Sequence, residues 1–153
     1  MKVLMVEPQK NAYETEIGND LKSMQEAVGG SIEAAYFFQE PVALVCNEEG
    51  KINGLKLNRS VRNEDNEIMD IVAGTFFICG LNEESFGSLK SEHMEKFKKM
   101  FLKPEIFMKT NNGIQSRKVS ESYFDNRKLK EYERWNMLCN NSCLLYTSDA
   151  ADE

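Results

Sequence analysis

The sequence contains few of the residues and motifs that metal, redox or phosphate chemistry requires. His93 is the only histidine among the 153 residues, and no two cysteines have the CxxC spacing that many zinc and thiol–disulfide sites use. Neither a GxxxxGK(S/T) loop nor a GxGxxG loop occurs, so no phosphate-binding loop is indicated. We therefore expect no metal and no cofactor, and the sequence identifies no catalytic residue.

Long apolar runs are also absent. No stretch approaches the roughly 20 apolar residues that span a bilayer, and the apolar run at the N-terminus is too short for a signal peptide. Cys46 and Cys79 lie among apolar neighbours, which is typical of reduced thiols in buried strands. These features predict a cytoplasmic protein that does not contact membranes.

The last eleven residues, 143–153, differ in character from the rest of the sequence. They resemble the conceptual translation of a sequencing adapter, so we interpret them as an artefactual tail that is disordered, and we set them aside as one sets aside a processing segment. On this interpretation the natural chain continues beyond Ser142. Hydrophobic residues make up 41% of the whole sequence and charged residues 29%, which suits a globular protein.

Charge is unevenly distributed along the remaining sequence. Residues 1–108 contain 12 basic and 18 acidic residues, a net charge of −6, whereas residues 109–142 contain 7 basic and 4 acidic residues. The acidic first part argues against tight binding to nucleic acid, which needs a basic surface. The basic second part is interpreted as a solvated helix face, with a nucleic-acid contact as the alternative.

Apolar patterning predicts an α+β fold, with a mostly antiparallel sheet, two helices packed on one face and a C-terminal helix. We expect residues 1–108 to form one domain and residues 109–142 to form a basic extension. Residues 55–62 fit a short helical or irregular segment, and Gly74 is interpreted as either a bulge within a strand or a point of close backbone approach. Strands are expected over residues 2–7, 13–17, 31–38, 42–46, 71–79 and 105–109.

Local signals mark the ends of the helices and one turn. Asp20 is expected to cap the first helix, and Gly29 to end it. Ser91 is expected to cap the second, and a third is expected over residues 125–138. Gly50 is expected to adopt a positive φ in the turn after a central strand. The second helix carries a predicted buried stripe of Met94, Phe97 and Phe101.

Five short motifs occur in order within residues 1–108. They are Met1-Lys2-Val3-Leu4-x-Val6-Glu7-Pro8, Leu21-x-x-Met24-Gln25-x-Ala27-Val28-Gly29-Gly30-x-Ile32-Glu33, Cys46-Asn47-Glu48-Glu49-Gly50-Lys51, Gly54-Leu55-x-Leu57-Asn58-Arg59-x-x-Arg62 and Asp70-Ile71-Val72-Ala73-Gly74-Thr75-Phe76-Phe77. Together they resemble one family, the domain of unknown function 3846. The resemblance carries over no assigned activity or cofactor, and it implies an origin in phages, plasmids and gut bacteria that carry mobile elements.

The motif Asn58-Arg59-x-x-Arg62 is the candidate site for binding an anion or a partner. On a helix, Arg59 and Arg62 would point the same way, and two guanidinium groups can clamp a carboxylate or phosphate. The structural alternative is that both arginines pair with nearby acids, and this is the simpler use of them. Those acids are Glu64, Asp65 and Asp70.

Three functions remain open from the sequence. The first is a non-enzymatic accessory or interaction protein of a mobile element, acting on a protein partner. The second is an acidic anti-restriction protein that mimics DNA, although mimicry needs a stronger and more patterned charge. The third is an enzyme that uses an unrecognised carboxylate pair, since paired acids can divide acid and base roles. The acidic pairs lie in predicted loops, where we expect them to be solvated.

Overall fold

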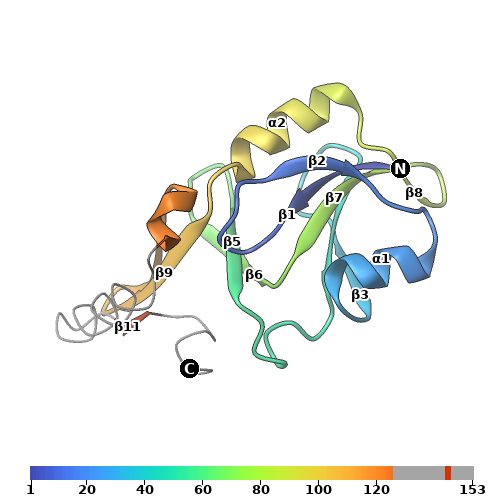
Figure 1. Cartoon of the computed structure of the whole chain (residues 1–153). Helices are drawn as coiled ribbons and strands as arrows, with labels where there is room; N and C mark the ends of the chain where they lie inside the picture. The colour runs from blue at the N-terminus through green and yellow to red at the C-terminus, as the bar shows by residue number, and fades with distance from the viewer. Residues whose placement is uncertain (126–143, 146–153) are drawn as a thin grey trace.

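The structure is a computed structural model that describes residues 1–125 and 144–145 (Figure 1). Its main sheet has the strand order β2-β1-β7-β4-β3, with β8 added beside β7, and every pairing is antiparallel. The prediction of a mostly antiparallel α+β fold is therefore confirmed. The strands of the main sheet are β1 (Lys2–Val6), β2 (Tyr13–Glu16), β3 (Ile32–Ala35), β4 (Val42–Asn47), β7 (Phe76–Leu81) and β8 (Phe86–Gly87).

Two smaller sheets accompany the main one. β5 (Leu57–Arg62) and β6 (Ile68–Ala73) form an antiparallel two-stranded ribbon. β9 (Glu105–Thr110) and β10 (Gly113–Lys118) form a hairpin around a turn at Asn111 and Asn112, and β11 (Leu144–Leu145) pairs with the other edge of β9. A short 3-10 helix, η1 (Glu121–Phe124), follows the hairpin.

The two helices, α1 (Leu21–Val28) and α2 (Ser91–Phe101), pack on opposite faces of the main sheet, so the prediction of a single covered face is wrong. The reason lies in the two central strands, where residues 42–46 of β4 and 76–79 of β7 are all apolar and buried, and successive side chains point alternately to the two faces. Both faces therefore need a cover. The α2 face includes Leu4, Leu44, Phe76, Ile78, Phe97 and Phe101, and the α1 face includes Val3, Met24, Val28, Val45 and Phe77.

The segment predicted to be helical or irregular, residues 55–62, is largely strand β5. Its burial pattern has no helical period because four consecutive residues, 58–61, are buried. The predicted strand 71–79 is likewise two strands, since Gly74 adopts a φ of +82° and separates β6 from β7. That conformation suits glycine, and it sends the chain from the ribbon into the main sheet.

The helix ends agree in part with the sequence signals. Asp20 caps α1, accepting a hydrogen bond from the Ser23 amide at 3.0 Å, and Gly29 ends it with a φ of +79°. The N-cap of α2 is Lys90 and not Ser91, and it makes no side-chain capping bond. Gly50 does not have a positive φ. A β-carbon there would lie 2.7 Å from the carbonyl oxygen of Ala73, so glycine is needed for close approach.

The C-terminal predictions fall mostly outside the described residues. This applies to the helix over residues 125–138, of which only Asp125 is described, as the residue that follows η1. Within the tail expected to be disordered, Leu144 and Leu145 form strand β11. The expected domain boundary after residue 108 lies inside β9. Among the described residues, no helix is long and apolar enough to cross a membrane.

Candidate functional site

Arg59 is fully buried and joins three segments of the chain. Its Nε–H donates to the carbonyl oxygen of Phe101 at the end of α2, at 3.0 Å, and Nη2 donates to the carbonyl oxygen of Lys10 at 2.6 Å. Nη1 donates to the side-chain oxygen of Asn58 at 2.8 Å. Burial lowers the pKa of Arg59 to about 10, and the negative charge of Glu105 opposes that shift.

Asn58 is equally inaccessible and connects the ribbon to the main sheet. Its amide nitrogen donates to the carbonyl oxygens of Val6 and Gly74, both at 2.9 Å, while its oxygen receives the bond from Arg59. The side chain therefore makes two donor bonds and one acceptor bond, close to the most an amide can form. Its role in this position is to satisfy backbone groups where β1 ends and β6 turns into β7.

The neighbouring Ser60 and Glu105 complete this buried polar group. The Ser60 hydroxyl donates to Oε1 of Glu105 at 2.6 Å, and the Ser60 amide donates to both carboxylate oxygens at 3.3 Å. Glu105 is 7% exposed. No sequence pattern marks Ser60 or Glu105 as part of a site. The burial of Glu105 depends on the packing of β9 beside β5, so it cannot be predicted from the sequence near Glu105.

Arg62 lies apart from Arg59, at the outer end of the ribbon, and is half-buried. Its guanidinium donates to the carbonyl oxygen of Asn66 and to the Ser116 hydroxyl, both at 2.7 Å. None of the bonds described for the two arginines goes to the acids that the structural alternative named. Asp70 instead pairs with Lys51 at 2.8 Å. The structure thus brings Asn58 and Arg59 together but does not place Arg62 with them.

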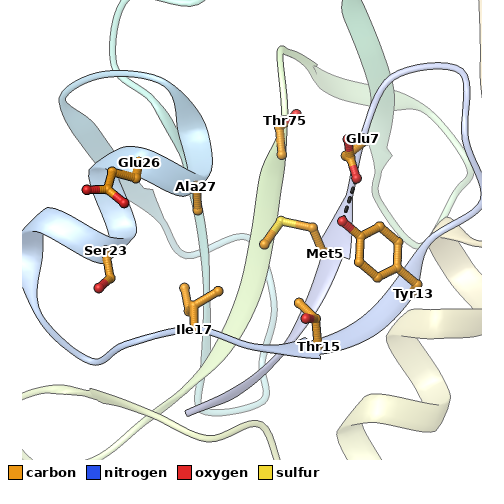
Figure 2. A pocket seen from close by; sticks show the side chains of 9 residues that line it. All are labelled: Met5, Glu7, Tyr13, Thr15, Ile17, Ser23, Glu26, Ala27 and Thr75. Carbon is orange, nitrogen blue, oxygen red and sulfur yellow. Dashed lines mark hydrogen bonds between the residues drawn. The ribbon is translucent and has the colours of Figure 1, made fainter.

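A different set of polar side chains lines an open groove beside α1, which we call the β1–β2 groove (Figure 2). It has a volume of about 470 Å³. Glu26 and Ser23 lie on the α1 side, and Glu7 and Tyr13 lie on the other side, with apolar side chains between them. Its lining residues are Met5, Glu7, Tyr13, Thr15, Ile17, Ser23, Glu26, Ala27 and Thr75.

Tyr13 and Glu7 form the polar wall of this groove. The Tyr13 hydroxyl donates to Oε2 of Glu7 at 2.5 Å, as the dashed line in Figure 2 marks. Burial raises the pKa of Tyr13 to about 12, and the hydrogen bond to Glu7 and its negative charge add to the shift. Lys10 lies 3.9 Å from the other oxygen of Glu7. The phenol therefore stays protonated at neutral pH and acts as a donor that holds the carboxylate.

Thiol and metal chemistry have little support in the described residues. Cys46 and Cys79 are buried free thiols. Burial is the main cause that raises the pKa of Cys46 to about 11 and that of Cys79 to about 12, so both are protonated at neutral pH and are weak nucleophiles. Within residues 1–125 and 144–145, no three His, Cys, Asp or Glu side chains are grouped as a metal site requires.

The comparison with family models decides the relationship that the motifs indicated. Residues 1–102 match the model of a domain of unknown function, DUF3846. The chain belongs to the DUF3846 family. Comparison with the curated proteins found no match, and comparison with the solved structures found none.

The DUF3846 match contains the groove and the whole motif from Asn58 to Arg62. The match does not include two residues that accept hydrogen bonds from the ribbon. Glu105 accepts one from Ser60, and Ser116 accepts one from Arg62. The β9–β10 hairpin therefore supplies hydrogen bonds to the DUF3846 region of this chain from beyond its matched end.

Proposed function

We propose that this chain is a non-enzymatic accessory protein of a phage, plasmid or other mobile element, and that it acts by binding a protein partner. The β1–β2 groove is the observation that carries the proposal. Carboxylates and hydroxyls from separate segments surround an apolar floor on an open surface (Figure 2). An apolar centre with a polar rim is the usual anatomy of a protein–protein contact. The mobile-element origin is what the resemblance noted in the sequence implies, and it is part of the proposal.

The state of the groove's side chains favours binding over acid–base chemistry. General acids and bases work best when their pKa lies near the operating pH. Tyr13, with a pKa of about 12, is fixed as a hydrogen-bond donor to Glu7. Ser23 is also engaged, since its hydroxyl donates to Asp20 at 2.7 Å. Such side chains offer a shaped, hydrogen-bonding surface and not a mobile proton.

The charge of the groove indicates the character of the partner surface. Glu7 and Glu26 lie on opposite sides of the floor. A partner segment with a lysine or arginine would complement them, and such complementarity steers association and fixes register more than it adds affinity. We therefore expect the complex to weaken as salt concentration rises.

Site-specific photo-cross-linking in a host that carries the intact element tests this function. A benzophenone amino acid is placed at Thr15, which lines the groove, or as a control at Glu16, the next residue of the same strand, whose side chain points to the other face. We expect a discrete cross-linked protein from Thr15 that disappears in a Glu7→Gln, Glu26→Gln variant. The same products from both positions, or none from Thr15, would contradict the proposal.

The genes that flank the intact gene provide a second test. Structural or conjugation genes of a mobile element agree with an accessory role. A consistent association with restriction systems would favour the acidic DNA mimic instead. Incubation of the purified protein with the target restriction enzyme would then separate the two, because a mimic inhibits cleavage in proportion to its occupancy of the DNA-binding site.

A further inference from the structure

A second hollow lies on the opposite face of the main sheet from the β1–β2 groove. We call it the Cys46 cleft. It lies between strands β3 and β4 of the main sheet and strand β6 of the ribbon, with a volume of about 260 Å³. Its walls are apolar and include Ala35, Phe37, Leu44, Cys46 and Val72. An apolar cavity of about 150 Å³ accommodates benzene, so this cleft has room for one ring with a short side chain.

The mouth of the cleft is polar and carries an excess of negative charge. Glu33, Glu48 and Asp70 contribute carboxylates, and Lys51 contributes one ammonium group. Lys51 and Asp70 pair at 2.8 Å, but their side chains are 58% and 43% exposed. Exposed ion pairs contribute little stability, so Lys51 can leave Asp70 at small cost. The mouth is therefore complementary to a cation.

The pKa of Cys46 shows that the carboxylates at the mouth act on a side chain in the wall of the cleft. Its pKa is raised first by burial and then by the negative charges of Glu33 and Asp70, while Lys51 acts in the opposite direction. The same three groups at the mouth thus influence an atom inside the cleft. The cleft can therefore hold a ligand that has an apolar part inside and a positively charged group at the mouth.

We propose that the Cys46 cleft binds a small arylalkylamine, with its ring between the main sheet and the ribbon and its ammonium group at Asp70, Glu33 and Glu48. This ligand class follows from the volume of the cleft, its apolar walls and its acidic mouth. The site is separate from the β1–β2 groove, so its test does not depend on the proposed protein partner.

Titration calorimetry of the full chain with three matched probes tests the proposal. The probes are 2-phenylethylamine, the neutral 2-phenylethanol and the anionic phenylacetate. We expect the amine to bind about fivefold more tightly than the alcohol, and phenylacetate to bind most weakly, because a partly exposed charge contact contributes about that factor. Equal affinity for the amine and phenylacetate would overturn the proposal, as would the lack of saturable binding by the amine.

Two substitutions at the mouth should act in opposite directions. Asp70→Asn should weaken binding of the amine about fivefold without changing the affinity for the alcohol. Lys51→Gln should tighten binding of the amine, because it frees the Asp70 carboxylate from its ion pair. Asp65→Asn, in the exposed turn between β5 and β6, is the matched control and should change neither. If the Lys51–Asp70 pair had a purely structural role, the two substitutions would change the affinity for the amine in the same direction. Equal changes in that affinity would therefore refute the placement of the ammonium group at Asp70.

The walls of the cleft offer an independent test. Ala35→Leu should fill it and abolish binding of both the amine and the alcohol, whereas Ala34→Leu, on the other face of β3, should not. The amine should also slow alkylation of Cys46 by iodoacetamide, measured by peptide mass spectrometry, while Cys79 on the α1 face serves as the reference. Unchanged binding in Ala35→Leu, or no protection of Cys46 at saturating amine, would place the ligand elsewhere.

Discussion

The buried segment of residues 58–60 and the β1–β2 groove contain similar polar groups in opposite settings. In the first, an amide, a guanidinium, a hydroxyl and the carboxylate of Glu105 are nearly inaccessible and hydrogen-bond one another and the backbone. In the second, a phenol, hydroxyls and carboxylates line an open surface. Accessibility, and not residue type, separates the two regions.

The difference explains why the motif with the most charge is not the most accessible site. A buried polar group is costly unless it is hydrogen-bonded, so the interior of the fold uses the donors of Arg59 to satisfy carbonyl groups. Polar groups on the groove are already hydrated and cost little to leave exposed. The groove is consequently the region for which we propose a protein partner, and the buried segment is expected to govern stability.

The largest expected effect is that of Arg59→Ala. We expect the free energy of unfolding to fall by about 3–5 kcal/mol, because the carbonyls of Phe101 and Lys10 lose a buried donor and Glu105 loses a nearby positive charge. Urea denaturation beside the parent protein measures it. A loss below about 1 kcal/mol would show that Arg59 does not hold these segments together. The buried segment would then contribute no more to stability than the exposed side chains of the groove.

Asn58→Ala is expected to have the next largest effect. Removing the amide leaves the carbonyl groups of Val6 and Gly74 without their buried donor, which should cost about 2 kcal/mol. Asn53→Ala, at an exposed position before the ribbon, is the control and should stay within about 0.5 kcal/mol of the parent. Similar urea midpoints for the two variants would contradict the role assigned to Asn58.

Arg62→Ala should be milder than Arg59→Ala although it removes the same side chain. Arg62 is half-buried, and its two hydrogen bonds lie near the ribbon turn, where water can replace it. We expect a loss of about 1 kcal/mol or less in the same urea experiment. A loss equal to that of Arg59→Ala would mean that Arg62 contributes as much to the free energy of unfolding as the buried Arg59.

The smallest effect on stability is expected in the groove, where ionisation is the sharper measurement. Tyr13 has a raised pKa in the folded protein, so its contribution to stability is present below about pH 10 and is lost as the pH rises towards 12. Titration of absorbance at 295 nm, taken as the difference between the parent and Tyr13→Phe, should show one phenol that ionises near pH 12.

Glu7→Gln gives the matched test of that assignment. It should move the pKa of Tyr13 downwards but not fully to 10, because burial, the larger cause, remains. Ionisation of Tyr13 at its ordinary pKa in the parent protein would show that the Tyr13–Glu7 contact does not persist in solution. Tyr13→Phe itself should change the free energy of unfolding by about 0.5 kcal/mol or less near neutral pH.

Sequence alone determined the elements whose signals lie within a few residues of one another. The sequence predicts the first two strands, helix α1 between Asp20 and Gly29, and the buried stripe of α2, and all three are confirmed. In each case the information is local, as a cap, a glycine or a period of apolar residues, and so can be identified before the partners are known. The family was also accessible at this level, because its motifs are short runs of adjacent residues.

Tertiary structure alone decided the rest, because it depends on which distant segments meet. β5 is buried by the end of α2 and by β9, so Arg59 points into the interior and residues 58–61 show neither a helical nor an alternating pattern. The opposite faces taken by the helices and the groove formed by β1, β2 and α1 likewise follow from the strand order. A sequence pattern specifies which side chains avoid water, but the packing of remote elements determines what each buried polar group must bond to.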